Sequence, residues 1–223
     1  MKKILISAAN GPIMPELITY LRKSYYVIGI DSNNTGLAKN YCNKFYKSPK
    51  GSDNKFIKFI NKIGMKADLI FLFVDEELVN VSQNLNKLKR IRNKIVISPK
   101  ETIITCNDKI KFQKYFENFK QINLPSLNKK KKSIIKPNIG RGSKNIIITE
   151  DFKVIECFKS NKNFIVQEYI NGKEYTVDCL FDNNGALIFS LPRERIISQN
   201  VSLVGKITKN KKITDFLKYI GTK

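Results

Sequence analysis

The sequence predicts an α/β domain with a Rossmann-like parallel sheet, followed by an α+β region. In the first hundred residues, short apolar runs alternate with stretches that repeat apolar residues at helical spacing, which is typical of a parallel sheet covered by helices. After this part, apolar runs follow one another across glycine or asparagine turns, which is typical of antiparallel strands. We therefore place the domain boundary between residues 104 and 105, giving domains 1–104 and 105–223.

The first domain is predicted to alternate strands with helices. Short apolar runs predict strands at 2–7, 25–32, 67–74 and 94–98. Apolar residues at helical spacing predict helices at 15–24, 54–64 and 77–91. In the second of these, Phe56, Ile60 and Ile63 fall on one face, so this face is expected to enter the core.

The second region is predicted to begin with a helix at 107–119, with Asn107 or Asp108 as its N-cap. Apolar runs on either side of a glycine-rich turn, ending at Pro137 and beginning at Asn145, predict an antiparallel pair of strands. The remaining predicted elements are a helix at 150–160, strands at 163–170, 174–182 and 186–192, and a helix at 211–221.

The net charge of +22 raises the question of nucleic-acid binding. Lysine supplies most of the positive charge and is spread along the chain, whereas arginine occurs at only six positions. The densest lysine cluster, residues 128–133, falls between two predicted elements and is expected to be a solvated loop. Nucleic acid is therefore an unlikely partner.

The chain contains four widely spaced cysteines and no histidine, which excludes a mixed cysteine–histidine zinc site and the usual Ser-His and Cys-His nucleophile pairs. The chain has a basic start followed by an apolar run of about five residues. This run is shorter than the apolar core of a signal peptide, which is about 7–15 residues long. No apolar run approaches the roughly 18 residues of a membrane span. We expect a cytoplasmic protein with reduced thiols and no membrane partner.

Two common nucleotide motifs are missing. Gly11 stands alone where the dinucleotide fingerprint G-x-G-x-x-G has three glycines, which favours a Rossmann-like sheet without bound NAD. The P-loop pattern is also missing. The stretch 136–144 instead places Lys136 at a strand end, before a loop that carries Gly140, Gly142 and Ser143. These residues fit an anion-binding loop, but basic glycine hairpins without a ligand are common, so the loop taken alone favours the hairpin.

A second group of residues follows this loop about twenty positions later. A strand ends in Gln167 and Glu168, the apolar pair Tyr169 and Ile170 follows, and Glu174 opens the next strand. A hinge between strands can offer backbone groups to a purine, and a carboxylate can accept from both ribose hydroxyls. The order of these pieces favours a nucleotide site over a simple hairpin.

Together these segments resemble the ATP-grasp superfamily, in particular the branch that includes the large subunit of carbamoyl-phosphate synthase and related carboxylate–amine ligases. The matching segments are "NDKIKFQKYF", "IIKPNIGRGSKNIIIT", "VQEYINGKEYTVDCLFDNNG" and "RERI". The resemblance implies a pre-ATP-grasp domain followed by an ATP-grasp domain, with a lid lobe at about 120–170 and part of a C-terminal lobe at 171–223.

The resemblance also implies roles for individual residues. Lys109 and Lys136 would face the phosphates, with Gly140, Gly142, Ser143 and Lys144 in a lid over them. Glu168, Tyr169 and Ile170 would form the adenine hinge, and Glu174 would hold the ribose. Arg193 and Arg195 would be catalytic, near the acyl phosphate and the substrate carboxylate; surface charge is the alternative reading of these two arginines.

The implied reaction activates a carboxylate with ATP, forming an acyl phosphate that an amine or ammonia attacks. The family's Mg²⁺ ligands lie in a later segment of the form E-I-N-x-R, which this sequence does not contain, so no metal ligand is assigned. We expect catalysis by this form, incomplete at its C-terminus, to be impaired. A non-catalytic nucleotide-binding or interaction module is the alternative, and a homodimer stays open.

Overall fold

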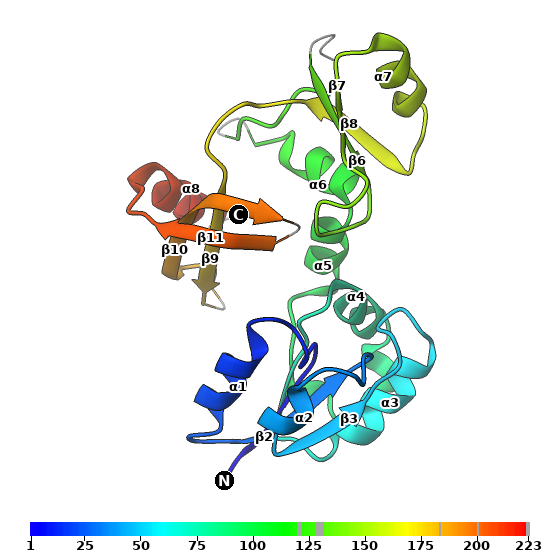
Figure 1. Ribbon diagram of the computed structural model, residues 1–223, viewed down its shortest axis with the longest axis vertical. Helices are drawn as coiled ribbons and strands as arrows, with labels where there is room; N and C mark the ends of the chain where they lie inside the picture. The colour runs from blue at the N-terminus through cyan, green and yellow to red at the C-terminus, as the bar shows by residue number, and fades with distance from the viewer. Residues whose placement is uncertain (120–121, 128–131, 183, 200, 222–223) are drawn as a thin grey trace. The chain divides into compact units, whose positions relative to one another are not determined.

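A computed structural model describes residues 1–223 except 120–121, 128–131, 183, 200 and 222–223. The chain forms two compact units, Met1–Tyr115 and Phe116–Lys223 (Figure 1). The predicted boundary at 104/105 falls within α5 (Lys100–Asn107), a helix that the sequence pattern did not predict. Most of the predicted solvated loop at 128–133 lies outside the described residues.

The first unit is built on a parallel sheet of five strands in the order β3-β2-β1-β4-β5. Its strands are β1 (Lys3–Ile6), β2 (Tyr26–Asp31), β3 (Lys44–Lys47), β4 (Leu69–Phe71) and β5 (Ile95–Val96). Four of these were predicted, although β4 is shorter than the apolar run at 67–74. The sheet confirms the predicted parallel α/β fold of this part of the chain.

The helices of the first unit follow the strands in chain order. They are α1 (Met14–Leu21), α2 (Ala38–Tyr41), α3 (Lys55–Gly64), α4 (Asp75–Gln83), α5 (Lys100–Asn107) and α6 (Lys109–Phe116). The predicted helix at 77–91 was too long, because α4 ends at Gln83 and 3₁₀ turns follow at Leu85–Lys87 and Arg92–Lys94. Asn84 stops α4 there, since its Nδ2 donates to the carbonyl oxygen of Asn80 over 2.9 Å.

Helices cover both faces of this sheet. Successive residues of β1 point to opposite faces, so Leu5 joins one apolar cluster while Ile4 and Ile6 join another. The first cluster contains the predicted core face of α3, including Phe56 and Ile60, which are both fully buried. The second contains the buried residues of α1. Within the described residues, no helix is both long and apolar enough to cross a membrane.

Asn10 and Asp31 connect the segments that follow β1 and β2, at the carboxyl ends of these two strands. The carboxylate of Asp31 accepts the backbone N–H groups of Asn10 (3.0 Å) and Asn33 (2.8 Å). The Asn10 amide donates to the carbonyl oxygen of Asn33 over 2.7 Å and accepts from the N–H of Ala38 over 2.9 Å. This network fixes the segments after β1 and β2 relative to each other.

Replacing Asn10 with alanine should destabilise the first unit by about 1–3 kcal/mol, the usual penalty for leaving a buried donor without its partner. Ala38 is buried, so its N–H would lose both the Asn10 oxygen and access to water. Urea denaturation would measure the change against Asn40→Ala, which alters an exposed asparagine on the neighbouring α2 and should shift stability by less than about 0.5 kcal/mol. Equal effects of the two variants would contradict this role of Asn10.

The second unit contains an antiparallel sheet of three strands in the order β7-β6-β8. The strands are β6 (Ser133–Pro137), β7 (Ile147–Thr149) and β8 (Phe164–Glu168), so the predicted pairing around the glycine loop is confirmed. Helix α7 (Phe152–Lys159) packs on this sheet through Ile155, which meets Ile135 and Val166 in a small core. Asp151 caps α7 by accepting the N–H of Lys153 over 2.8 Å.

A separate antiparallel sheet, ordered β11-β10-β9, follows in the same unit. Its strands are β9 (Tyr175–Phe181), β10 (Leu187–Gln199) and β11 (Val201–Ile207), and helix α8 (Lys211–Gly221) contacts β10. Strand β10 extends well beyond the predicted 186–192, because the charged run from Arg193 to Arg195 interrupts the apolar pattern without interrupting the pairing with β9 and β11. The two antiparallel sheets confirm the α+β prediction.

Candidate nucleotide-binding site

The glycine loop between β6 and β7 contains four residues with a positive φ angle: Gly140, Gly142, Ser143 and Asn145. Gly142 has a φ of 66°, and Ser143 (53°) and Asn145 (56°) share this left-handed backbone conformation. Residues other than glycine and asparagine rarely adopt it. Gly140 also has a positive φ, of 154°. The side chains of Ser143 and Lys144 are exposed, and neither makes a hydrogen bond or an ion pair with any described residue. Both can therefore contact an anion above the loop.

Lys136 lies on β6, immediately before this loop, and is half-buried. Its Nζ donates to Oε1 of Gln167 on the neighbouring strand β8, over 3.2 Å. Burial lowers the pKa of Lys136, and the nearby negative charge of Glu174 partly offsets this effect by raising it. A partly desolvated ammonium attracts phosphate more strongly than an exposed one, because the surrounding dielectric is lower.

Gln167 is the site residue that sequence reasoning missed. It is buried, and its amide oxygen holds Lys136 in position. The contact depends on the antiparallel pairing of β6 with β8, in which Ile134 lies opposite Gln167 and Lys136 lies opposite Ile165. No local pattern in the sequence gives this register, so the sequence named Gln167 only as part of a strand end.

The predicted adenine hinge follows β8. The backbone N–H of Glu168 donates to the carbonyl oxygen of Ser126 over 2.8 Å, and the Ser126 N–H donates to Oε1 of Glu168 over 3.1 Å. The Tyr169 N–H donates to the carbonyl oxygen of Lys132 over 2.9 Å. Ile170 is 62% exposed, and among described residues its N–H has no hydrogen-bond acceptor. The geometry thus leaves Ile170 as the hinge residue whose amide can contact a base.

Glu174 and Arg195 form an ion pair, with Arg195 Nη1 2.5 Å from Glu174 Oε1. The backbone repeats the contact, because the Arg195 N–H donates to the Glu174 carbonyl oxygen over 2.8 Å. Arg195 is mostly buried, and its Nε has no hydrogen-bond partner in the described part of the chain. The predicted ribose carboxylate and one predicted catalytic arginine therefore form an ion pair with each other.

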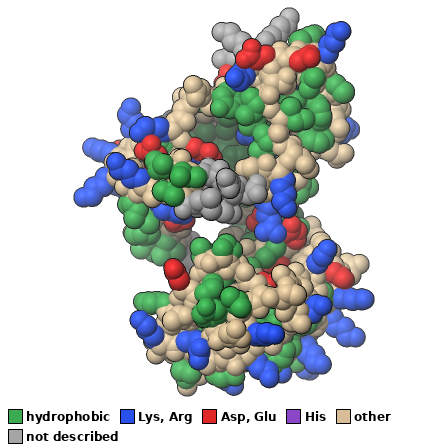
Figure 2. Space-filling view, viewed as in Figure 1, with side chains coloured by type: hydrophobic (Ala, Val, Ile, Leu, Met, Phe, Trp, Pro, Cys, Tyr) green, Lys and Arg blue, Asp and Glu red, His purple; other side chains and the backbone are tan. Residues whose placement is uncertain are grey.

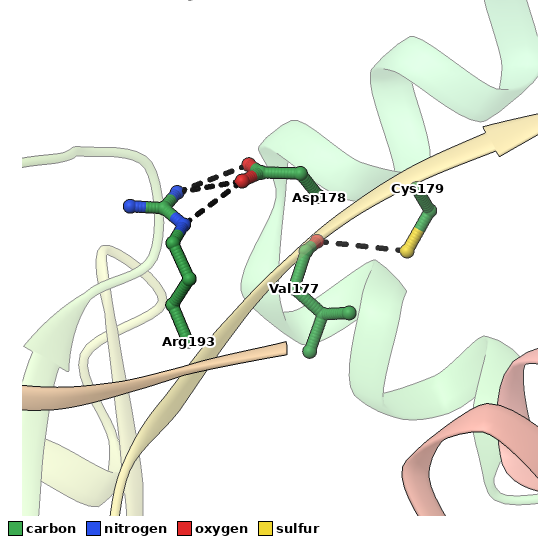
Figure 3. A network of polar contacts seen from close by, with 4 residues as sticks. All are labelled: Val177, Asp178, Cys179 and Arg193. Atoms are coloured by element: carbon green, nitrogen blue, oxygen red, sulfur yellow. Dashed lines mark hydrogen bonds and ion pairs between the residues drawn. The ribbon is translucent and has the colours of Figure 1, made fainter. Parts of the chain in front are cut away.

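Arg193 makes a bidentate contact with Asp178 of β9 (Figure 3). Its Nε and Nη2 donate to the two carboxylate oxygens over 2.9 and 3.1 Å. The same view shows the Cys179 thiol donating to the carbonyl oxygen of Val177, over 3.5 Å. Both predicted arginines are thus paired to acidic residues, Arg193 to Asp178 on β9 and Arg195 to Glu174 just before β9. Such pairs hold a guanidinium in one orientation.

Lys109 opens α6 in the first unit, whereas the other predicted site residues belong to the second. Its phosphate contact stays a prediction. No group of three or more cysteine, aspartate and glutamate side chains suited to a metal ion occurs among the described residues. On the face that Figure 2 shows, lysine and arginine side chains are scattered over both units without forming one continuous patch.

Comparison with known proteins identifies the second half of the chain. Residues 106–216 match the family model of the ATP-grasp domain. This part of the chain belongs to the ATP-grasp family. The match includes β6, the glycine loop, the hinge and both arginines, so the residues described above lie in an ATP-grasp domain. Whether the chain falls in the carbamoyl-phosphate synthase branch stays a prediction.

Solved structures share the fold along the whole chain. An L-amino acid ligase from Bacillus licheniformis matches 100% of this chain and 59% of its own length, at 13% identity and a TM-score of 0.69. The N5-carboxyaminoimidazole synthetase from Staphylococcus aureus, solved with ADP, matches 99% of this chain and 62% of its own, at 14% identity and a TM-score of 0.69. The chain thus spans about 60% of the length of these proteins. At such identities the likeness shows a shared fold.

One curated sequence relative is the probable polyketide synthase 3 of Dictyostelium discoideum. It is 26% identical over an alignment of 204 positions, which covers 78% of this chain and 7% of that protein. A match to so small a share of a large protein does not carry that protein's activity to an ATP-grasp chain.

Proposed function

We propose that the ATP-grasp domain binds ATP and that the chain takes part in ATP-dependent carboxylate–amine ligation. The observation that supports this most directly is the arrangement around Lys136. Its partly buried ammonium donates a hydrogen bond to Gln167, and the negative charge of Glu174 raises its pKa. Lys136 itself lies at the end of β6, just before the exposed glycine loop. A phosphate, a base and a ribose each then have a partner of suitable chemistry.

In this proposal, Lys136 and the loop from Gly140 to Lys144 bind the phosphates. The Ile170 N–H donates to the adenine, which Tyr169 flanks. Glu174 accepts from the ribose hydroxyls after releasing Arg195, and the freed guanidinium becomes available to an anion. Since Arg195 already has a buried Nε without a described partner, an incoming carboxylate or phosphate oxygen would satisfy it.

The chemistry takes two displacement steps. A carboxylate oxygen of the substrate attacks the γ-phosphorus of ATP, the bond to the β–γ bridging oxygen breaks, and ADP leaves. An amine nitrogen then attacks the acyl carbon, inorganic phosphate leaves with the C–O bonding electrons, and the nitrogen loses a proton. Arg193 and Arg195 would stabilise the charge on the phosphoryl oxygens, since positioning and charge stabilisation carry most of such catalysis.

Mg²⁺ would supply further charge neutralisation on the ATP phosphates. The described residues do not offer a set of ligands for it, so none of the steps above is assigned to a metal held by this chain.

Titration calorimetry with a non-hydrolysable ATP analogue and Mg²⁺ tests the proposal. We expect saturable binding with one nucleotide per chain, and competition by ADP. ADP release in the presence of a panel of carboxylates and amines then tests ligation. Binding without turnover would favour the non-catalytic nucleotide-binding module. The absence of nucleotide binding would contradict the proposal, and steeply salt-dependent oligonucleotide binding in its place would favour the nucleic-acid alternative.

A further inference from the structure

A groove between α3 and the end of α4, in the first unit, has a volume of about 500 Å³. Sites for small molecules usually measure about 300–1,000 Å³. The lining combines four asparagines, two lysines and one apolar side chain: Asn54, Ile57, Lys58, Asn61, Asn80, Asn84 and Lys87. None of these residues has a predicted role at the ATP site, so the groove is a separate feature of the fold.

Helix α3 presents its polar face to this groove. Asn54, Ile57, Lys58 and Asn61 follow the spacing i, i+3, i+4, i+7, which aligns them along one side of a helix. The other side carries Phe56 and is buried in the core. The polar residues are therefore held in place by the packing of the opposite face.

The asparagines of α4 are fixed by bonds that use their amide hydrogens. Nδ2 of Asn80 donates to the carbonyl oxygens of Gly51 (2.7 Å) and Asp53 (3.2 Å). Nδ2 of Asn84 donates to the backbone and side-chain oxygens of Asn80, over 2.9 and 3.1 Å. The amide hydrogens of both side chains are thus engaged, and Oδ1 of Asn80 already accepts from Asn84. Of these two amides, Oδ1 of Asn84 is the oxygen left to accept a hydrogen bond from a ligand.

Asn61 supplies a further acceptor. Its Oδ1 is buried and has no hydrogen-bond partner among the described residues, although the side chain lines the groove. A buried amide oxygen without a donor is unfavourable, because it has lost its hydrogen bonds to water. The last torsion of asparagine is soft, so a small rotation would bring this oxygen to a hydroxyl placed in the groove.

The positive charge at this groove comes from Lys58 and Lys87. Both are exposed, and neither forms an ion pair with a described residue. Lysine is abundant throughout the chain, so the two ammonium groups would mean little alone. Together with the amide oxygens of Asn61 and Asn84, they suit a ligand that has both a negative charge and hydrogen-bond donors.

We propose that this groove binds a small polyhydroxylated phosphate of the sugar-phosphate class. Sugar hydroxyls donate to the oxygens of Asn61 and Asn84, and the phosphate lies between the ammonium groups of Lys58 and Lys87. A nucleotide fits less well, because Ile57 is the one apolar residue of the lining and no aromatic ring lines the groove to stack on a base.

Titration calorimetry of the full chain with ribose 5-phosphate tests the proposal, with ribose and inorganic phosphate as separate probes. We expect saturable binding of ribose 5-phosphate that is about tenfold tighter than that of either part alone, since each additional hydrogen bond or charge contact contributes roughly 1–1.5 kcal/mol. Asn61→Ala and the double variant Lys58→Ala/Lys87→Ala should each weaken binding by about tenfold. The control Lys62→Ala, on α3 outside the groove, should leave it unchanged.

Asn61→Ala also separates a binding role from a structural one. It removes a buried acceptor that has no described partner, so we expect the melting temperature to hold or rise while affinity falls. Lys136→Ala, in the ATP-grasp domain, should not affect this binding. The proposal is overturned by an absence of ribose 5-phosphate binding, by equal binding of phosphate alone, by an equal loss in Lys62→Ala, or by a loss in Lys136→Ala.

Discussion

Replacing Lys136 with alanine is expected to weaken ATP binding by about ten- to a hundredfold, the effect of losing a charge-assisted contact of roughly 1.5–3 kcal/mol. Lys136 is half-buried and oriented by Gln167, so its ammonium acts on a phosphate through a less polar medium than bulk water. Titration calorimetry with a non-hydrolysable ATP analogue measures the change. Lys153→Ala, on the exposed start of α7 in the same unit, is the matched control and should bind as the parent chain does.

The pH dependence of ATP binding gives an independent check of the role of Lys136. Burial lowers the pKa of Lys136, so the charged form that binds phosphate is lost as pH rises, and at a lower pH than for an exposed lysine. ATP affinity of the parent chain should therefore decline on the alkaline side. Lys136→Arg keeps its charge and should flatten that decline. An ATP affinity that is the same in the parent chain and in Lys136→Ala at every pH would remove Lys136 from the phosphate site.

Gln167→Leu distinguishes positioning of Lys136 from simple proximity. With leucine at this position, the Lys136 ammonium lacks its described hydrogen-bond acceptor but keeps its charge. A positioning role predicts that Gln167→Leu loses less ATP affinity than Lys136→Ala. It also predicts that the pH at which ATP affinity declines differs from that of the parent chain. A loss of stability alone, with affinity and pH profile unchanged, would assign Gln167 to the core.

The fold was predictable where a strong apolar period coincides with an element. Phe56, Ile60 and Ile63 revealed α3, and the runs on either side of the glycine loop revealed the β6–β7 pair. Strand β3 was not predicted, because its four residues, Lys44–Lys47, are too few to show an alternating pattern. Helix α5 escaped for a different reason: it has no buried residue, so no apolar face marks it in the sequence.

For the candidate site, the sequence indicated which elements carry the residues but not which residues pair with one another. Ordered motifs placed Lys136, the glycine loop, the hinge and Glu174 on neighbouring elements of one domain. The ion pair between Glu174 and Arg195 depends on how β9 lies against β10, residues that are far apart in the chain. Such cross-strand contacts are set by the register of the sheet, and register is a tertiary property.

Replacing Phe56 with alanine should lower the free energy of unfolding of the first unit by about 3–5 kcal/mol. Phe56 is fully buried in the larger apolar cluster, and its ring lies 6.4 Å from that of Phe59, so truncation leaves a cavity that rigid neighbours cannot close. Because the chain has two units, a probe within the first one is needed. The Cys42 thiol is such a probe, since it is buried and burial raises its pKa to about 11, which keeps it unreactive while the unit is folded.

Labelling of Cys42 in increasing urea, read by mass spectrometry of its peptide, therefore reports opening of the first unit. The midpoint should fall sharply in Phe56→Ala and stay in place in Lys55→Ala, which changes an exposed neighbour on α3. At urea concentrations where the first unit of Phe56→Ala has opened, ATP binding also tests Lys109, the predicted phosphate contact in that unit. Affinity retained there would contradict the role of Lys109.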